Sequence, residues 1–463
     1  MDLDPVFLSR LQFAWVIGWH ILLPAFTVGL ASFIAVLEGV FLWRGDVVYA
    51  RVSTFWIRIF SVSFGMGVVS GIIMPFQFGT NWSRYADATA NVLAPLFAYE
   101  GLTAFFLEAA FLGVLLFGRK LVPKPLYFFA SLMVAFGTLL SSFWILAVNS
   151  WMQTPAGYDL IDGRFFPVDW SAIIFNPSFP YRLAHTVTGF YVTTALIVAG
   201  VGAYTIRQAK APAEGRVMLS MALWLLTALV PLQIVIGDLH GLNTLKYQPA
   251  KLAAMEGLWD TQSGAPLTLF ALPDQAGERN RFEISIPQIG SLYLTHSLTG
   301  TVQGLKDFPP DQRPPVAVVF FAFRIMVACG LAMLALVLAS LWLRARGRLF
   351  AAVWFLKAAY VTAPFGLIAV IAGWTTTEVG RQPWTVYGLL RTSASVTPSL
   401  TGTDVLISFT AYMLVYLIMY PAGLLVMSRM VRNGPAGPQA PAVIEAGRSE
   451  DAFDAAITAR PLP

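Results

Sequence analysis

Two glutamates, Glu100 and Glu108, lie within one apolar stretch, residues 94–117, which contains no basic residue to pair with either. The stretch is long enough to cross a bilayer as a helix, because about 20 apolar residues span the hydrocarbon core. On a helix the two carboxyl groups would lie roughly 12 Å apart along the axis. A lone carboxylate in lipid is costly, so we expect each to face a cofactor, a metal or a hydrated path. The alternative is a pair of protonated acids buried among neighbouring helices.

Histidine and methionine side chains in apolar segments suggest haem ligation, since both are axial ligands of haem iron. His185 lies in PYRLAHTVTGFY, Met326 in FAFRIMVACG and His20 in FAWVIGWHILLPAF. Arg324 precedes Met326 by two residues, and its planar guanidinium could bind a haem propionate. The alternative for Met326 is ordinary packing, and for each histidine a satisfied interface residue.

Two further acidic positions could take part in the same chemistry. Glu378, in AGWTTTEVGRQPW, could ligate a haem iron or exchange protons beside it, as could Glu100. Lys251 and Glu256 lie five residues apart in QPAKLAAMEG. Spacing alone favours an exposed pair on a short amphipathic helix for these last two.

The composition indicates an integral membrane protein. Of 463 residues, 57% are hydrophobic and only 12% are charged, with a net charge of +5. Soluble proteins carry about 25% charged residues. The charge is spread over loops and predicts no nucleic-acid binding. The one cysteine, Cys329, excludes an intramolecular disulfide and an all-cysteine iron–sulfur site in this chain.

Hydropathy predicts an all-α fold with nine transmembrane helices. The expected spans are residues 11–43, 54–76, 94–117, 126–148, 185–206, 217–237, 316–343, 353–374 and 405–428. The chain therefore divides into six helices (1–237), a long external loop (238–315), three helices (316–432) and a Pro- and Ala-rich tail (433–463). We expect the loop to be functional or disordered and the tail to be disordered.

Arginine and lysine follow the odd-numbered spans, whereas the short even-numbered connections are poorer in bases. The positive-inside rule then places the N-terminus outside and the C-terminus in the cytoplasm. With this orientation His20, His185, Met326 and Glu378 all fall in the outer half of the membrane, with Glu108 near mid-depth. Clustering at one depth favours a shared site.

Several long motifs resemble subunit I of the cytochrome bd-type quinol oxidases. They are SRLQFAW with His20, FQFGTNW (76–82), YEGLTAFFLE, SWMQTP (150–155), FRIMVACG (323–330) and GRQPW (380–384). The likeness runs from about Ser9 to Met430. It implies a respiratory-chain oxidoreductase of the bacterial inner membrane that oxidises quinol and reduces dioxygen to water.

The resemblance also implies roles for individual residues. His185 and Met326 would be axial ligands of a low-spin haem b, and His20 and Glu378 would ligate two further haems; which ligand serves which haem stays open. Glu100 would lie beside the oxygen-reducing iron. The remaining implied roles are a proton route from the cytoplasm (Glu108 and Ser141), quinol binding (Lys251 and Glu256) and cofactor binding (Arg324, Arg381 and Trp384).

The same family implies two or three b haems, with haem d an option at the oxygen site, and a second large membrane subunit; a small single-span subunit is also allowed. The loop is of the short form and carries His240 in GDLHG, as in the branch called cyanide-insensitive quinol oxidases. On composition alone, His240 and His296 are expected to be solvated loop residues. His240 could also assist quinol deprotonation.

Two other functions are compatible with parts of the pattern. A proton-coupled secondary transporter would explain Glu100 and Glu108, but the chain has no evident inverted repeat. A haem b membrane anchor of a quinone-linked dehydrogenase would share His185 and Met326, but it would not need three acids around an open iron.

Overall fold

The computed structural model describes residues 4–435 of the chain. Within this range nine helical segments are long and apolar enough to cross a membrane, which confirms the prediction of an all-α protein with nine spans. They are α1 (Pro5–Arg44), α2 (Val47–Thr80), α3 with η1 and α4 (Ser83–Tyr99, Glu100–Phe105 and Phe106–Phe117), α5 (Lys124–Gln153), α7 (Phe179–Arg207), α8 (Pro212–Tyr247), α11 (Val316–Ala345), α12 with α13 (Val353–Val361 and Phe365–Val379) and α14 (Gly402–Asn433).

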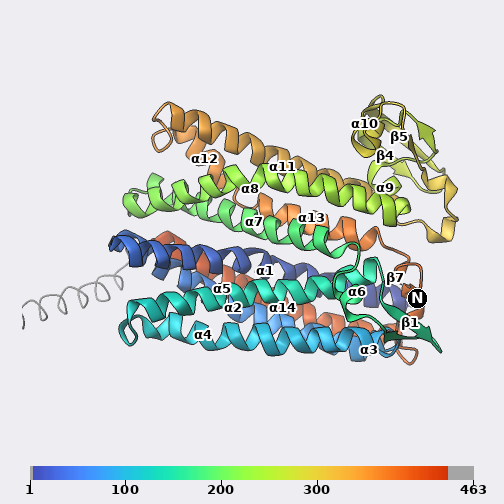
Figure 1. Cartoon of the computed structure of the whole chain (residues 1–463), viewed down its shortest axis with the longest axis horizontal. Helices are drawn as coiled ribbons and strands as arrows, with labels where there is room; N and C mark the ends of the chain where they lie inside the picture. Colours follow the sequence, from blue (N-terminus) through green and yellow to red (C-terminus); the bar gives the residue numbers. More distant parts are fainter. Residues whose placement is uncertain (1–3, 436–463) are drawn as a thin grey trace, which may run out of the picture.

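The connections at one end of the bundle carry short elements of their own. They are α6 (Trp170–Ile174), α9 (Pro249–Glu256), α10 (Ile289–Thr295), and the antiparallel pairs β1 (Tyr158–Ile161) with β2 (Arg164–Pro167), β3 (Gln262–Ser263) with β6 (Thr301–Val302), β4 (Leu267–Asp274) with β5 (Arg279–Ile286), and β7 (Trp384–Val386) with β8 (Leu390–Arg391). Figure 1 shows β1, β7, α9, α10 and the β4–β5 hairpin at the end of the bundle where the N-terminus lies. Residues 248–315 are therefore an ordered cap with an apolar core of their own.

Small residues let the helices approach closely. Gly202 of α7 and Gly215 of α8 face one another: a methyl group at Gly202 would lie 2.7 Å from the Leu219 backbone nitrogen. Close backbone approach at small residues is a common way for membrane helices to associate. α1 lies among α2, α5, α7, α13 and α14, and its second half contributes a large part of the buried apolar core.

Two spans are irregular, and one of the two irregularities begins at a candidate site residue. The third span contains a π-helical turn, Glu100–Phe105, that begins at Glu100. Such turns occur often at functional sites. The eighth span is interrupted between α12 and α13 at Pro364, a residue that cannot continue the hydrogen-bond ladder of a helix.

The helices extend past most of the predicted boundaries. α8 ends at Tyr247, ten residues beyond the expected end of the sixth span at 237. α13 continues to Val379, so Glu378 belongs to its last turn. The predicted tail, 433–463, lies outside the described residues from 436 onward.

Candidate functional site

A cavity of about 1490 Å³ runs through the bundle and collects most of the predicted site residues. Sites for single drug-sized ligands are roughly 300–1,000 Å³. The space is therefore large enough for more than one bulky group. The predicted residues that line it are His20, Glu100, Glu108, Ser141, His185, Lys251, Glu256, Met326, Glu378 and Arg381.

His185 lies in the second turn of α7, against α8. The amide nitrogen of Gln233 is 3.3 Å from His185 Nδ1, and Gly237 leaves room for the imidazole edge. The ring of His240 meets that of His185 edge to face, with centroids 5.4 Å apart. The expectation that His240 is a solvated loop residue is therefore wrong: it lies on α8, because the helix continues beyond the apolar window, and it lines the cavity.

Met326 approaches the cavity from α11, on the side of α13. A methyl group at Gly373 of α13 would lie 2.9 Å from the Met326 sulfur, so this glycine allows the thioether to lie against the helix. His185 and Met326 thus come from α7 and α11, two of the four helices (with α8 and α13) that surround this part of the space.

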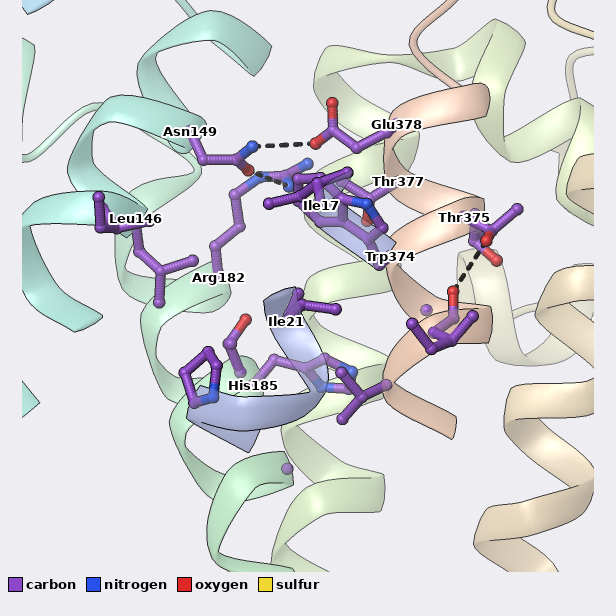
Figure 2. A pocket seen from close by; sticks show the side chains of 18 of the residues that line it. Ile17, Ile21, Leu146, Asn149, Arg182, His185, Trp374, Thr375, Thr377 and Glu378 are labelled. Carbon is purple, nitrogen blue, oxygen red and sulfur yellow. Dashed lines mark hydrogen bonds between the residues drawn. The ribbon is translucent and has the colours of Figure 1, made fainter. Parts of the chain in front are cut away.

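The Glu378 carboxylate is held by three donors. Asn149 Nδ2 and Gln153 Nε2 donate to Oε1 over 2.9 and 3.1 Å, and Arg381 donates to Oε2 over 2.5 Å. Figure 2 shows Asn149 between Glu378 and Arg182. Each carboxylate oxygen has about two lone-pair sites. Oε1 is saturated, whereas Oε2 retains one site for a further partner.

Two arginines of the cavity lining carry buried donors without a hydrogen-bond partner among the described residues. They are Nε of Arg182 and Nε and one terminal nitrogen of Arg381. Both side chains line the cavity and are less than 10% exposed. Buried guanidinium groups normally find acceptors, and the fork of an arginine suits a carboxylate. Arg182 was missed from the sequence, although it stands one helical turn before His185.

His20 of α1 is fixed through one ring nitrogen. Its Nδ1 lies 2.9 Å from the hydroxyl of Ser70 on α2, and that hydroxyl also lies within hydrogen-bond distance of the Met66 and Gly67 carbonyl oxygens. Because the serine proton is used by a backbone carbonyl, Nδ1–H of the histidine would donate to Ser70. Nε2 then keeps a free lone pair for a ligand.

Glu100 and Glu108 differ in their partners. The Ser141 hydroxyl of α5 donates to Glu100 Oε1 over 2.8 Å. Glu108 packs against Gly137 of α5, where a methyl group would lie 2.6 Å from its Cγ. Ser141, predicted to act with Glu108, is thus bonded to Glu100.

Lys251 and Glu256 lie on α9, and both side chains are buried, so the exposed-pair alternative is wrong. Burial, with Arg182 nearby, lowers the pKa of Lys251 well below its usual value. Burial raises the pKa of Glu256, while Tyr293 and Arg324 oppose the rise. Neither carboxyl oxygen of Glu256 has a hydrogen-bond partner of regular geometry among the described residues. The carboxyl group lies on the cavity wall beside Tyr293.

Arg324 and Trp384 lie elsewhere than expected. The Arg324 guanidinium donates to the Met255 carbonyl oxygen over 2.7 Å and to the Thr268 carbonyl oxygen over 3.1 Å, so it ties α9 and β4 to α11 rather than pointing at a propionate. Trp384 lies in β7 with its ring beneath the guanidinium of Arg391. His296 is exposed, as expected.

The residues present suit haem better than a bare metal ion. Within residues 4–435, no three His, Cys, Asp or Glu side chains come together in a metal-binding group. Haem needs only one or two protein ligands, since the porphyrin supplies the rest. Single candidate ligands on a large apolar cavity, with unpartnered arginine donors beside it, fit a propionate-bearing macrocycle.

These features define a multi-pass membrane protein with a large cavity next to a folded loop, residues 248–315. The family model for cytochrome bd terminal oxidase subunit I matches residues 8–435. The chain is 35% identical over 440 residues to cytochrome bd ubiquinol oxidase subunit 1 of Bacillus subtilis, covering 92% of this chain and 93% of that one. It is 32% identical over 509 residues to cytochrome bd-II ubiquinol oxidase subunit 1 of Escherichia coli, covering 94% and 98%.

The fold agrees with these matches. The bd oxidase from Geobacillus thermodenitrificans superposes with a TM-score of 0.87 at 30% identity, covering 94% of this chain and all of that one. The chain belongs to the cytochrome bd terminal oxidase subunit I family. Membership makes it a quinol:dioxygen oxidoreductase subunit of the bacterial cytoplasmic membrane, with haem cofactors and a partner subunit. The transporter and dehydrogenase-anchor alternatives are thereby set aside.

Proposed function

We propose that this chain oxidises quinol beside α9 and delivers the electrons, through haems held by His185 with Met326, by Glu378 and by His20, to dioxygen. The observation that carries the proposal is that one cavity joins all of these side chains to Lys251 and Glu256. When bound, the haems supply one-electron carriers and an iron at which oxygen is reduced.

Quinol oxidation releases two protons and two electrons, so the site needs a proton acceptor. Glu256 has the properties of one, because its carboxyl group is buried, lies on the cavity wall and has Tyr293 as its neighbour. In its ionised form it would take the proton of a quinol hydroxyl within hydrogen-bond reach. Lys251, on the same helix, would orient a quinol oxygen through its side-chain nitrogen.

The ligand roles follow from which atoms remain available. Glu378 Oε2 and His20 Nε2 each keep a lone pair that could bind iron. The other acceptor atoms, Glu378 Oε1 and His20 Nδ1, are already in hydrogen bonds. Arg182 and Arg381 would bind propionates through their unpartnered donors. Glu100, held by Ser141, would act beside the oxygen-reducing iron.

Proton supply is assigned to Glu108, Glu100 and Ser141. Glu108 lies two helical turns from Glu100 along the third span, and both carboxyl groups line the cavity. An acid in the membrane interior that can gain and lose a proton is a usual element of a proton route. With the N-terminus outside and the C-terminus in the cytoplasm, this route would rise from the cytoplasm and make turnover electrogenic.

The proposal includes two or three b haems, with haem b or haem d at the oxygen site, and a partner subunit II with or without a small single-span subunit. We also propose that the chain belongs to the branch of the family with a short quinol loop, called cyanide-insensitive quinol oxidases. The direct test is oxygen uptake by the purified complex with quinol, combined with pyridine-haemochrome analysis. Quinol-driven uptake and at least three haems per complex support the proposal. A complex that holds haem but consumes no oxygen with quinol contradicts it.

A further inference from the structure

The side-chain amide of Gln153, the last residue of α5, lies between the quinol loop and the Glu378 carboxylate. Its Oε1 accepts hydrogen bonds from Lys251 Nζ over 2.7 Å and from Gln248 Nε2 over 3.1 Å. Its Nε2 donates to Glu378 Oε1 over 3.1 Å. All three partners of this amide are buried or nearly so, and Gln153 itself is fully buried.

The neighbours of Gln153 determine which way its amide points. The reversed amide would place its NH₂ group against the nitrogens of Lys251 and Gln248, which are donors, and its oxygen against the carboxylate. The Lys251 nitrogen can donate whether or not it is charged. The chain Lys251–Gln153–Glu378 is therefore polarised in one direction, and in a buried environment each bond of such a chain strengthens the next.

We propose that Gln153 is a positioning residue that couples the occupancy of the quinol site at Lys251 to the reduction potential of the haem whose iron Glu378 would ligate. The inference rests on the proposed function. A ligand oxygen that accepts a hydrogen bond from Lys251 competes with Gln153 for this nitrogen and weakens the bond to Gln153 Oε1, so the amide N–H of Gln153 becomes a weaker donor to Glu378. More negative charge stays on the carboxylate, which favours ferric iron.

Two features of the structure allow an experiment to distinguish a purely structural role of the Gln153 side chain from a role in coupling. The backbone carbonyl oxygen of Gln153 accepts a second hydrogen bond from Gln248 Nε2 over 2.9 Å, and this bond survives any side-chain substitution. Asn149 offers a matched control, because it donates to the same Glu378 oxygen over 2.9 Å, but its own side-chain oxygen accepts from Arg182 rather than from Lys251.

The experiment is a spectroelectrochemical titration of each haem in the purified complex, with and without a saturating hydroxyquinoline N-oxide, a redox-inert quinol analogue. In the wild type, the analogue is expected to lower the midpoint potential of the Glu378-linked haem. Gln153→Met should start from a lower potential and show no analogue-induced shift. Asn149→Leu should also start lower but keep the shift. Lys251→Met should show no analogue-induced shift. The double variant Lys251→Met with Gln153→Met should likewise show no shift.

Three outcomes overturn the inference: no analogue-induced shift in the wild type, a full shift in Gln153→Met with the analogue bound, or a Gln153→Met protein that does not bind the analogue at all. Gln153→Leu serves as the second variant if Gln153→Met does not assemble. Failure of the proposed function has a different signature, because Glu378→Leu would then retain every haem with unchanged spectra.

Discussion

The Ser141 hydroxyl on α5 donates a 2.8 Å hydrogen bond to Glu100, the residue at which the third span turns π-helical. A hydrogen bond to a charged group contributes about 1.5–3 kcal/mol, equivalent to roughly a tenfold to hundredfold change in an equilibrium. Ser141→Ala should therefore slow quinol-driven proton uptake by at least about tenfold. The measurement is proton uptake by proteoliposomes during turnover.

Ser142→Ala is the matched control for this prediction, because the Ser142 hydroxyl donates to the Thr138 carbonyl oxygen of its own helix over 2.9 Å. It should behave as the wild type. Equal uptake rates in both variants would show that Ser141 has no part in proton delivery.

Gly137 is required by the position of Glu108. A methyl group there would meet Glu108 Cγ at 2.6 Å, so Gly137→Ala must displace the acid or the helix. Overpacking of this kind costs about 1–3 kcal/mol, and we expect a lower melting temperature together with impaired proton uptake. Gly113→Ala, on α4, places its methyl group in open space and should change neither quantity. A Gly137→Ala protein with normal stability and uptake would rule out this tight contact.

Glu256 should make the rate of quinol oxidation fall at acidic pH, which appears as an acidic limb in the pH–rate profile. Burial raises its pKa, so protonation as the pH falls removes the proton acceptor. Glu256→Gln should slow turnover by about 100-fold or more and abolish that limb. The control is Glu283→Gln, since Glu283 lies on β5 and pairs with Asn280 at the surface. An unchanged pH profile in Glu256→Gln would remove Glu256 from the reaction.

The same pKa shift has a consequence for stability. Because the folded protein holds this proton more tightly than the unfolded chain does, the contribution of Glu256 is most favourable below the usual pKa and is lost as the pH rises through the raised value. The stability of the Glu256→Gln protein should therefore decrease less than that of the wild type as the pH rises from mildly acidic to neutral. Thermal unfolding of the purified complex over this range measures the effect.

Arg324 should be needed for the quinol loop rather than for haem retention. Its guanidinium bonds to the Met255 and Thr268 carbonyl oxygens and lies over the ring of Phe320. Arg324→Ala should raise the KM for quinol and speed amide hydrogen exchange in α9 and β4, while the haem content stays unchanged. Loss of a haem with normal exchange would instead restore the propionate role expected from the sequence.

The sequence was sufficient for the spans, and most of the candidate site residues that it indicated line the cavity, because an apolar run and an isolated polar group in lipid are both local signals. His240 was misplaced because α8 continues past its apolar window. The local pattern of α9 suggested an exposed helix, whereas the cap formed by residues 248–315 buries Lys251 and Glu256. Their burial depends on packing between segments far apart in the chain.

The network around Glu378 could not be predicted for the same reason. Gln153, Asn149 and Arg182 belong to α5 and α7, and no spacing in the sequence relates them to a residue on α13. Arg182 alone offered a local signal, an arginine one turn from a candidate ligand at the start of an apolar helix.

The most direct test of a haem-filled cavity is the reduced-minus-oxidised spectrum of the Met326→Leu complex. Substitution of an axial thioether by an alkyl group should remove or shift the low-spin haem b signal and leave the other haem signals in place. Met218→Leu, on α8, fully buried in the apolar core and away from the cavity lining, should give the wild-type spectrum. A wild-type spectrum from Met326→Leu would contradict the assignment of this cavity as the haem site.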